Sequence, residues 1–241
     1  MNPTPSPEVG GAITALVQGR HQQPHDLLGQ HLEPGGLRIR VLKPLAQSVQ
    51  VRFEDGVTLD LAHEAEGVWT AVRADAERTM DYRLAVAWAD GIEHVQDDPY
   101  RFAPTLGEVD LHLVNEGRHE LLWTVLGSRL HEYDGPMGPV KGVAFAVWAP
   151  RAKAVRVIGD FNDWDGRIHP MRMLGGSGVW ELFVPDVGVG NIYKYEIRGA
   201  DDVVRTKADP MARRTECPPN TGSVVDASGH EWGDAQWMEQ R

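Results

Sequence analysis

The chain has 241 residues, enough for two domains of about 100 residues each. Its composition, 41% hydrophobic and 24% charged, is typical of a folded globular protein and argues against extensive disorder. The 35 acidic residues exceed the 24 Lys and Arg, and the formal net charge of −11 disfavours a nucleic-acid partner, because phosphate binding needs a basic face. A neutral ligand or a protein partner fits this charge better.

The single cysteine, Cys217, excludes a disulfide within the chain and a zinc site built on several cysteines. No apolar run approaches the roughly 18 residues that a membrane span needs. The first ten residues are polar and rich in proline, which is not the pattern of a signal peptide. We therefore expect a cytoplasmic protein without a membrane partner.

Two stretches have apolar residues at helical spacing. Residues 8–18 place Ile13 and Leu16 on one side, and Gly19 follows as a stop signal. Residues 119–130 carry four apolar residues with the same periodicity. We expect this second helix to lie between two domains and to link them.

Most of the remaining chain predicts short β-strands. Apolar and polar side chains alternate along residues 37–42, 155–158, 179–184 and 192–197, in runs broken by Gly, Pro and Asp. The predicted fold class is all-β, with two tandem immunoglobulin-like β-sandwich domains and short connecting helices. The expected organisation is a leader of residues 1–20, a first sandwich of residues 21–115, a linking helix of residues 116–134, a second sandwich of residues 135–226 and a linker of residues 227–241.

An internal repeat supports two copies of one fold. Residues 36–51 align with residues 142–157 at an offset of 106. Residues 81–99 align with residues 192–210 at an offset of 111. The second copy therefore has five extra residues, and they fall in the segment 159–166.

That segment carries the strongest candidate for a binding site. It places Trp164 among Asn162, Asp163 and Asp165. A sugar ring has a face of C–H groups and a rim of hydroxyls, so it is bound by an aromatic side chain together with polar groups. Lys194, on a strand of the same domain, would add a donor. Alternatively, Trp164 covers an open end of the sandwich and touches no ligand.

The other tryptophans and the histidines predict structural roles. Trp69 and Trp180 occupy equivalent places in the two copies and are expected in the cores, whereas Trp88 aligns with an arginine and is expected at the domain interface. The spacing of the histidines fits no standard zinc pattern, and we expect no metal site and no cofactor; they are His21, His25 and His31. No catalytic set of residues stands out, so no catalytic residue is predicted.

The sequence resembles the N-terminal part of bacterial 1,4-α-glucan (glycogen) branching enzymes. The resemblance rests on "PHDLLGQH" (24–31), "FAVWAPRAKAVRVIGDFNDWDGRIHPMR" (145–172), "SGVWELFVP" (177–185), "YKYEI" (193–197) and "KADPMA" (207–212). It covers nearly the whole chain after residue 10.

In this family an N-terminal β-sandwich and a carbohydrate-binding module of family 48 precede a (β/α)8 catalytic barrel. The resemblance therefore implies that residues 227–241 lead toward a barrel outside this sequence, because such a barrel typically needs about 250 residues of its own. It implies that the parent protein is a glycosyltransferase and that these 241 residues are inactive alone.

Related glycogen-binding modules hold the glucan between two tryptophans, with a lysine and an asparagine nearby. The resemblance matches Trp164 to the first tryptophan, Lys194 to the lysine and Asn220 to the asparagine. Residues 203–205, where the second tryptophan is expected, contain no aromatic side chain. We therefore expect weak binding of α-glucan, and we expect no sugar site on the first sandwich, which lacks the segment 159–166.

Three functions remain open at this stage. The leading hypothesis is a non-catalytic region that binds and positions α-glucan for transfer of α-1,4 chains to α-1,6 branch points. The second is a stand-alone glycogen-targeting module. The third is a structural pair of sandwiches that braces the barrel, with an inert Trp164.

Overall fold

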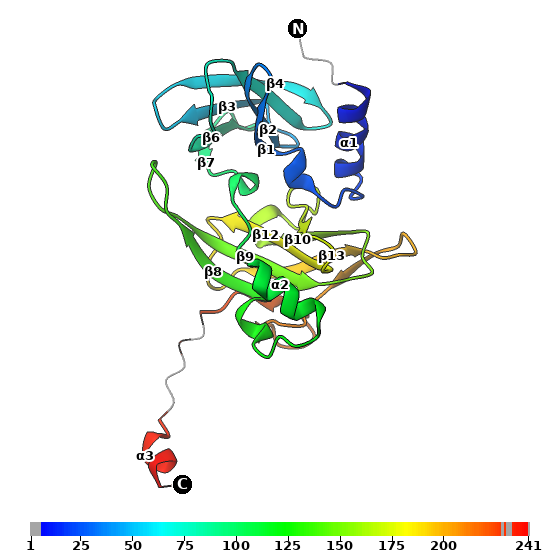
Figure 1. The fold of residues 1–241 in the computed structure, drawn as a ribbon, viewed down its shortest axis with the longest axis vertical. Coiled ribbons are helices and arrows are strands. Elements are labelled where there is room, and N and C mark those ends of the chain that lie inside the picture. The colour runs from blue at the N-terminus through cyan, green and yellow to red at the C-terminus, as the bar shows by residue number, and fades with distance from the viewer. Residues whose placement is uncertain (1–5, 228, 230–232, 241) are drawn as a thin grey trace.

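The computed structural model describes residues 6–227, 229 and 233–240. Two β modules are stacked in chain order, with α1 beside the first and α2 on the far side of the second (Figure 1). The α-helices in the described residues are α1 (Pro7–Val17), α2 (Glu108–Asn115) and α3 (Ala235–Glu239). Short 3-10 helices are η1 (Pro24–Asp26), η2 (Pro99–Arg101), η3 (Leu122–Thr124) and η4 (Asp160–Asn162).

The first module is a seven-stranded antiparallel sheet that folds over its own core. Its strands are β1 (Gly29–Glu33), β2 (Gly36–Leu42), β3 (Ser48–Phe53), β4 (Thr58–Ala65), β5 (Val68–Arg73), β6 (Tyr82–Ala87) and β7 (Glu93–Gln96), in the order β1-β2-β5-β4-β3-β6-β7. The first half of β4 pairs with β3 and the second half with β5, with a register shift between His63 and Ala65. This irregular strand lets the two halves of the sheet face each other, and apolar residues of β2, β3 and β6 fill the space between them.

The second module is a two-sheet sandwich. One sheet has the order β11-β12-β9-β8, and its strands are β8 (Gly127–Tyr133), β9 (Val140–Trp148), β11 (Arg172–Met173) and β12 (Val179–Pro185). The other has the order β10-β13-β16-β15 with β14 on β13, and its strands are β10 (Ala154–Gly159), β13 (Ile192–Arg198), β14 (Val204–Lys207), β15 (Arg214–Thr215) and β16 (Ser223–Val224). The predicted all-β sandwich fold is thus confirmed.

The repeat in the sequence is also a repeat of buried hydrogen bonds. The Tyr82 hydroxyl donates to Asp98 Oδ2 at 2.6 Å, and the Tyr193 hydroxyl, 111 residues later, donates to Asp209 Oδ2 at the same distance. In both copies the aspartate also accepts a backbone N–H two residues on, at 3.1 Å in the first and 2.8 Å in the second. A buried carboxylate needs several donors to remain paired, which explains why the whole arrangement recurs.

The tryptophans predicted for the cores repeat in the same way. Trp180 is fully buried, and Trp69 is half-buried against the core of the first module. The Trp69 indole N–H donates to the Lys43 carbonyl at 3.2 Å, and that of Trp180 donates to the Ala149 carbonyl at 3.1 Å. The prediction that both are packing residues is confirmed.

The helix predicted over residues 8–18 is present as α1, but the helix predicted over residues 119–130 is wrong. Residues 122–124 form one 3-10 turn, and the chain then enters β8 at Gly127, whose φ is +89°. Leu122, Val125 and Leu126 join an apolar cluster of the second module. Leu130 does not join it, because it lies on β8 and is 49% exposed. The expected helical link over residues 116–134 is therefore not formed, and the helix that exists, α2, lies away from the first module (Figure 1).

Helix α1 is joined to the second module by two arginines. Arg156 Nη2 donates to the Val17 carbonyl at 2.8 Å, and Arg198 donates to the carbonyls of Gly19 and Gln18 at 2.8 and 2.9 Å. These carbonyls at the end of a helix lack partners within it and carry its negative dipole, so cationic donors stabilise them. The second module thereby caps the C-terminal end of α1, a helix that comes before the first module in the sequence.

A continuous apolar core runs through the boundary between the modules. It contains Ile13, Leu16, Leu28 and Tyr100 from the N-terminal half, together with Trp180 and other core residues of the second sandwich. The Tyr100 hydroxyl donates across the boundary to the Pro170 carbonyl at 3.2 Å. Burial of this kind stabilises by about 25 cal/mol per Å² of apolar surface, so the two modules form one packed body.

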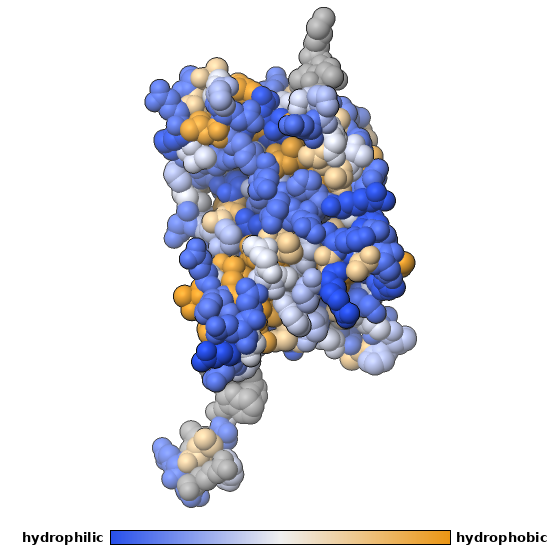
Figure 2. All heavy atoms as spheres, turned by 45° about the vertical axis from the view of Figure 1, so that its right-hand side comes forward, coloured by the Kyte–Doolittle hydropathy of each residue, from blue (hydrophilic) through white to orange (hydrophobic). Residues whose placement is uncertain are grey.

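The surface is largely polar. On the face shown in Figure 2, hydrophilic residues predominate and apolar residues form separate groups. Among the described residues, no helix has the length and apolar character needed to cross a lipid bilayer.

Substitution of Gly29, at the start of β1, tests this description of the fold. Gly29 has a φ of +86°, and a Cβ there would lie 2.5 Å from the Tyr100 carbonyl oxygen. Gly56 has nearly the same φ, +85°, but open space around it. We expect Gly29→Ala to lower the free energy of unfolding by about 3 kcal/mol and Gly56→Ala by about 1 kcal/mol, because only the first adds a backbone clash to the strain. Equal losses in urea denaturation would contradict this account.

Candidate functional site

The loop between β10 and β11 displays the indole of Trp164. It begins at the end of β10, turns through η4 and places Asp163 and Trp164 in the left-handed region, with φ of +51° and +59°. The backbone N–H of Trp164 donates to the Gly159 carbonyl at 2.9 Å, and this hydrogen bond closes the turn. The side chain remains 43% exposed. Two consecutive non-glycine residues in this region are strained, and here the strain holds a large apolar side chain in contact with water.

Asn162 holds this loop from inside rather than facing a ligand. It is 4% exposed. Its Oδ1 accepts from the Gly159 N–H at 2.9 Å, and its Nδ2 donates to the Val157 carbonyl at 3.0 Å and to His169 Nδ1 at 2.9 Å. The geometry therefore differs from the sequence prediction: the amide is occupied by the loop itself and does not face outward with Trp164.

The two acidic neighbours of Trp164 differ in their availability. Asp165 forms an ion pair with Arg167 at 2.6 Å, and the hydrogen bonds from Arg167 lower the pKa of this carboxyl. Asp163 is exposed. Of the two, Asp163 has the more accessible carboxylate for a hydroxyl rim.

Lys194 lies on β13, and its side chain reaches the connection between β15 and β16 that carries Asn220. Lys194 pairs in register with Ile158 of β10, one residue before the strand ends, and its Nζ donates to Thr221 Oγ1 at 2.7 Å. Asn220, next to Thr221, is exposed and donates to Glu216 Oε1 at 3.1 Å. The loop that carries Trp164 approaches β13 too, since a Cβ at Gly166 would lie 3.0 Å from Glu196 Oε1 on this strand.

The three histidines are separately accommodated. His21 Nδ1 accepts from the Gln23 N–H at 3.1 Å, and His31 Nε2 lies 3.1 Å from the Leu28 carbonyl. His25 packs edge-on against Tyr100, and burial lowers its pKa well below the usual value. No group of three or more His, Cys, Asp or Glu in the described part of the chain could hold a metal ion.

Trp88 lies at the boundary between the modules, as its unmatched place in the repeat predicted. It lines a cavity of about 560 Å³ together with residues of the Trp164 loop. Trp164 itself does not line this cavity, although it lies on the same loop as the lining residues Asp163 and Asp165.

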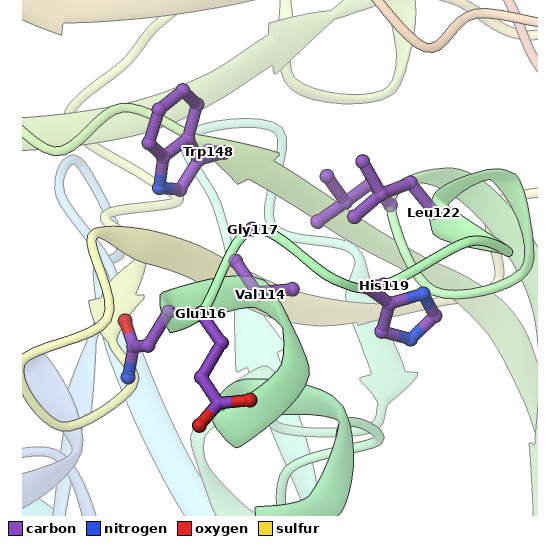
Figure 3. Close-up of a pocket in the computed structure, with 8 residues that line it drawn as sticks. Val114, Glu116, Gly117, His119, Leu122 and Trp148 are labelled. Atoms are coloured by element: carbon purple, nitrogen blue, oxygen red, sulfur yellow. The ribbon is translucent and has the colours of Figure 1, made fainter.

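The sequence reasoning missed Trp148, another exposed tryptophan, which lines a hollow. Trp148, at the end of β9, is 55% exposed and lines a mainly apolar hollow of about 390 Å³. Figure 3 shows its ring on one side of the hollow and Val114, Gly117 and Leu122 along the other. The repeat contained a signal for this residue, because Trp148 aligns with Leu42, which is buried.

Two family models match the two modules. Residues 10–100 match the model described as alpha-1,4-glucan branching enzyme GlgB, N-terminal domain, and residues 126–212 match Carbohydrate-binding module 48 (Isoamylase N-terminal domain). The two matched domains follow each other along the chain, the GlgB N-terminal match first and the family 48 match second. The loop with Trp164 and the strand with Lys194 both lie in the second of these domains.

The chain is similar to part of several GlgB proteins. It is 52% identical over 229 residues to the 1,4-alpha-glucan branching enzyme GlgB of Rhodococcus jostii, a match that covers 95% of this chain and 31% of that protein. It is 54% identical to the GlgB of Thermobifida fusca, covering 95% of this chain and 30% of the relative. The chain thus spans about a third of the length of these curated relatives.

Solved structures with some likeness include the pullulanase of Anoxybacillus sp. LM18-11, with 17% identity, a TM-score of 0.34 and coverage of 82% of this chain and 27% of that one. The ligand-free PulA of Klebsiella pneumoniae has 17% identity, a TM-score of 0.35 and coverage of 83% and 21%. Likeness at this level supports no inference about this chain.

Burial of His169 beneath the Trp164 loop makes stability depend on pH. Burial, with the nearby charge of Lys43, lowers the pKa of His169 to about 3. The unfolded chain binds this proton below a pH of about 6.5 and the folded chain does not, so acidification from that value toward 3 favours unfolding. We expect the change from pH 7 to pH 5 to remove about 2 kcal/mol of stability through His169.

The variant His169→Gln keeps an acceptor for Asn162 but has no group that titrates in this range. Its free energy of unfolding, measured by urea denaturation, should therefore fall less between pH 7 and pH 5 than that of the wild type. The lowered pKa of His25 acts in the same direction in both proteins, so the difference isolates His169. Parallel pH profiles would show that His169 does not contribute.

Proposed function

We propose that this chain is the non-catalytic N-terminal region of a 1,4-α-glucan branching enzyme of glycogen biosynthesis, and that its family 48 module binds α-glucan and positions it for transfer. The observation that carries the proposal is the strained, 43% exposed Trp164 on a loop rooted in the module. The match of the two modules to the GlgB N-terminal domain and the family 48 module supports the same ligand class.

The chemistry of the surface around Trp164 suits a neutral sugar. An exposed indole offers a flat apolar surface for the C–H groups of a glucose ring, and the desolvation of both surfaces favours contact. Lys194 supplies donors and Asp163 an acceptor for the hydroxyls around the rim. Asn220 extends the polar rim on the adjacent turn. Asn162 and Asp165 support the loop and are not proposed as direct contacts.

One indole gives weak binding to a single short chain. Residues 203–205 of the neighbouring strand are Val, Val and Arg, so this part of the face lacks a second aromatic surface. We expect a dissociation constant of about 1 mM for maltooligosaccharides, which corresponds to about −4 kcal/mol. Branched glycogen presents many chain ends, and multiple contacts raise its apparent affinity.

In the parent enzyme this binding would keep glucan chains near the transfer site. The parent cleaves an α-1,4 bond, holds the donor chain covalently and passes it to a 6-hydroxyl of an acceptor chain. The proposed partners of these modules are α-glucan and the rest of the enzyme, and the proposed location is the cytoplasm, where no membrane partner is required.

The test compares two tryptophans of similar exposure. Trp164→Ala should clearly reduce the retardation of the chain in glycogen-containing native gels, because an exposed aromatic surface for the sugar is removed. Trp123→Ala is the matched control, since Trp123 is 55% exposed and lies on η3 rather than on the loop between β10 and β11. It should migrate as the wild type does.

Two outcomes would contradict the proposal. If the wild-type protein migrates equally with and without glycogen, the modules do not bind glycogen, and a purely structural role explains them better. Equal retardation of the wild type and Trp164→Ala would place glucan binding elsewhere. Circular dichroism of each variant checks that the fold is unchanged.

A further inference from the structure

The boundary between the two modules contains a cleft with walls from both. Its volume is about 560 Å³, within the range of small-molecule sites. The first module supplies Lys43, Leu45, Trp88 and Gln96, and the second supplies Phe161, Asp163, Asp165 and His169. Neither module alone forms this cleft, because its two walls come from different sheets that the inter-module core holds together.

The inner part of the cleft has buried polar groups with fixed partners. Lys43 is 7% exposed, and its Nζ donates to Gln96 Oε1 at 2.9 Å, which occupies one of its three N–H donors. His169 is also 7% exposed and accepts at Nδ1 from Asn162, so a neutral His169 carries its proton at Nε2 and can donate there. Buried donors of this kind are costly unless something accepts from them.

The outer part of the cleft has apolar surface. Trp88 is half-buried and packs partly on the core of the first module. Leu45 is 81% exposed and has a φ of +67°, a rare conformation for a branched apolar residue. Strain that holds an apolar side chain in water at the edge of a cleft indicates a contact that is made only when the cleft is filled.

We propose that this inter-module cleft is a second α-glucan subsite, in which the Trp88 and Leu45 surfaces contact the faces of glucose units and Lys43, Gln96, His169 and Asp163 bond their hydroxyls. The proposal rests on the proposed function for the ligand class and adds a site lined by Asp163 and Asp165 of the Trp164 loop but not by Trp164 itself. It revises the expectation that the first module takes no part in sugar binding.

The charges of the cleft favour a neutral ligand over an anion. Lys43 is the only ammonium in its lining, and it lies near the carboxyl of Asp98. The carboxylates of Asp163 and Asp165 line the same cleft and would repel a phosphate or carboxylate group. A polyol can use acceptors and donors together without a net charge to neutralise.

The Trp164 loop forms a wall shared by both surfaces. Asp163 and Asp165 line the cleft, while Trp164, between them in sequence, does not line it and is 43% exposed. A glucan chain bound on Trp164 could therefore continue over the loop into the cleft, which would compensate for the missing second aromatic residue near Trp164.

The two sites can be separated by nuclear magnetic resonance of the full 241-residue chain titrated with maltotetraose. The reporters are the indole N–H signals of Trp88 and Trp164 and the side-chain amide of Gln96. In Trp164→Ala, which removes the outer site, we expect saturable shifts of the Trp88 and Gln96 signals to persist. Absence of these shifts while wild-type Trp164 responds would overturn the cleft and leave the proposed function standing. Persistent shifts at Trp88 with no response at Trp164 would support the cleft and contradict the outer site.

The variant Leu45→Gly tests the apolar wall without harming the fold. Glycine tolerates a φ of +67°, so this change relieves strain while it removes the contact surface. In the Trp164→Ala background it should weaken maltotetraose binding at the Trp88 signal by about fivefold. Asp202→Gly is the matched control, since Asp202 also has a positive φ, +61°, and does not line the cleft; it should not change the affinity.

Two further results would overturn the proposal. One is equal affinity in Leu45→Gly and Asp202→Gly. The other is a saturable response of the Trp88 and Gln96 signals to inorganic phosphate at lower concentrations than to maltotetraose, which would identify an anion site.

Discussion

The structure depends on the apolar core that passes from one module into the other. Ile13 and Leu16 of α1 are buried in a cluster that extends to Trp180 in the second sandwich. Arg156 and Arg198 of the second module then satisfy the carbonyls at the end of α1. A helix that would otherwise be a mobile leader becomes the joint between two sandwiches. Because packed interiors resist deformation, this joint fixes the relative position of loops that belong to different sheets.

The two copies share a core and differ in one connection. Both bury a tyrosine–aspartate pair and hold a tryptophan indole against a backbone carbonyl. The first copy connects β3 to β4 over residues 54–57, whereas the second connects β10 to β11 over residues 160–171. The extra length forms a loop that the buried side chain of Asn162 anchors through hydrogen bonds to Gly159, Val157 and His169. A repeated scaffold with one lengthened loop is an economical arrangement for binding, since stability and recognition depend on different residues.

Three of the six non-glycine residues with positive φ in the described part of the chain lie around this loop. Asp163, Trp164 and Leu45 all have positive φ, and they lie on the loop or directly across the cleft from it. Each such residue costs about 1–3 kcal/mol and persists only where surrounding contacts hold it. Here the supporting contacts are those of Asn162 and the inter-module core. Exposed apolar groups held in strained positions are poorly explained by stability alone, and they agree with a surface shaped for a ligand.

The sequence by itself determined the features that depend on local pattern and on the repeat. Alternation of side chains predicted the strands, equivalent positions predicted the packing of Trp69 and Trp180, and the insertion located the loop of Trp164. Only the tertiary structure decided what depends on approach in space. Periodicity could not distinguish a helix over residues 119–130 from a turn and a strand, because both bury the same apolar residues. Polarity could not show that Asn162 faces inward, and no pattern in one module could reveal a cleft whose opposite wall comes from a segment more than sixty residues away.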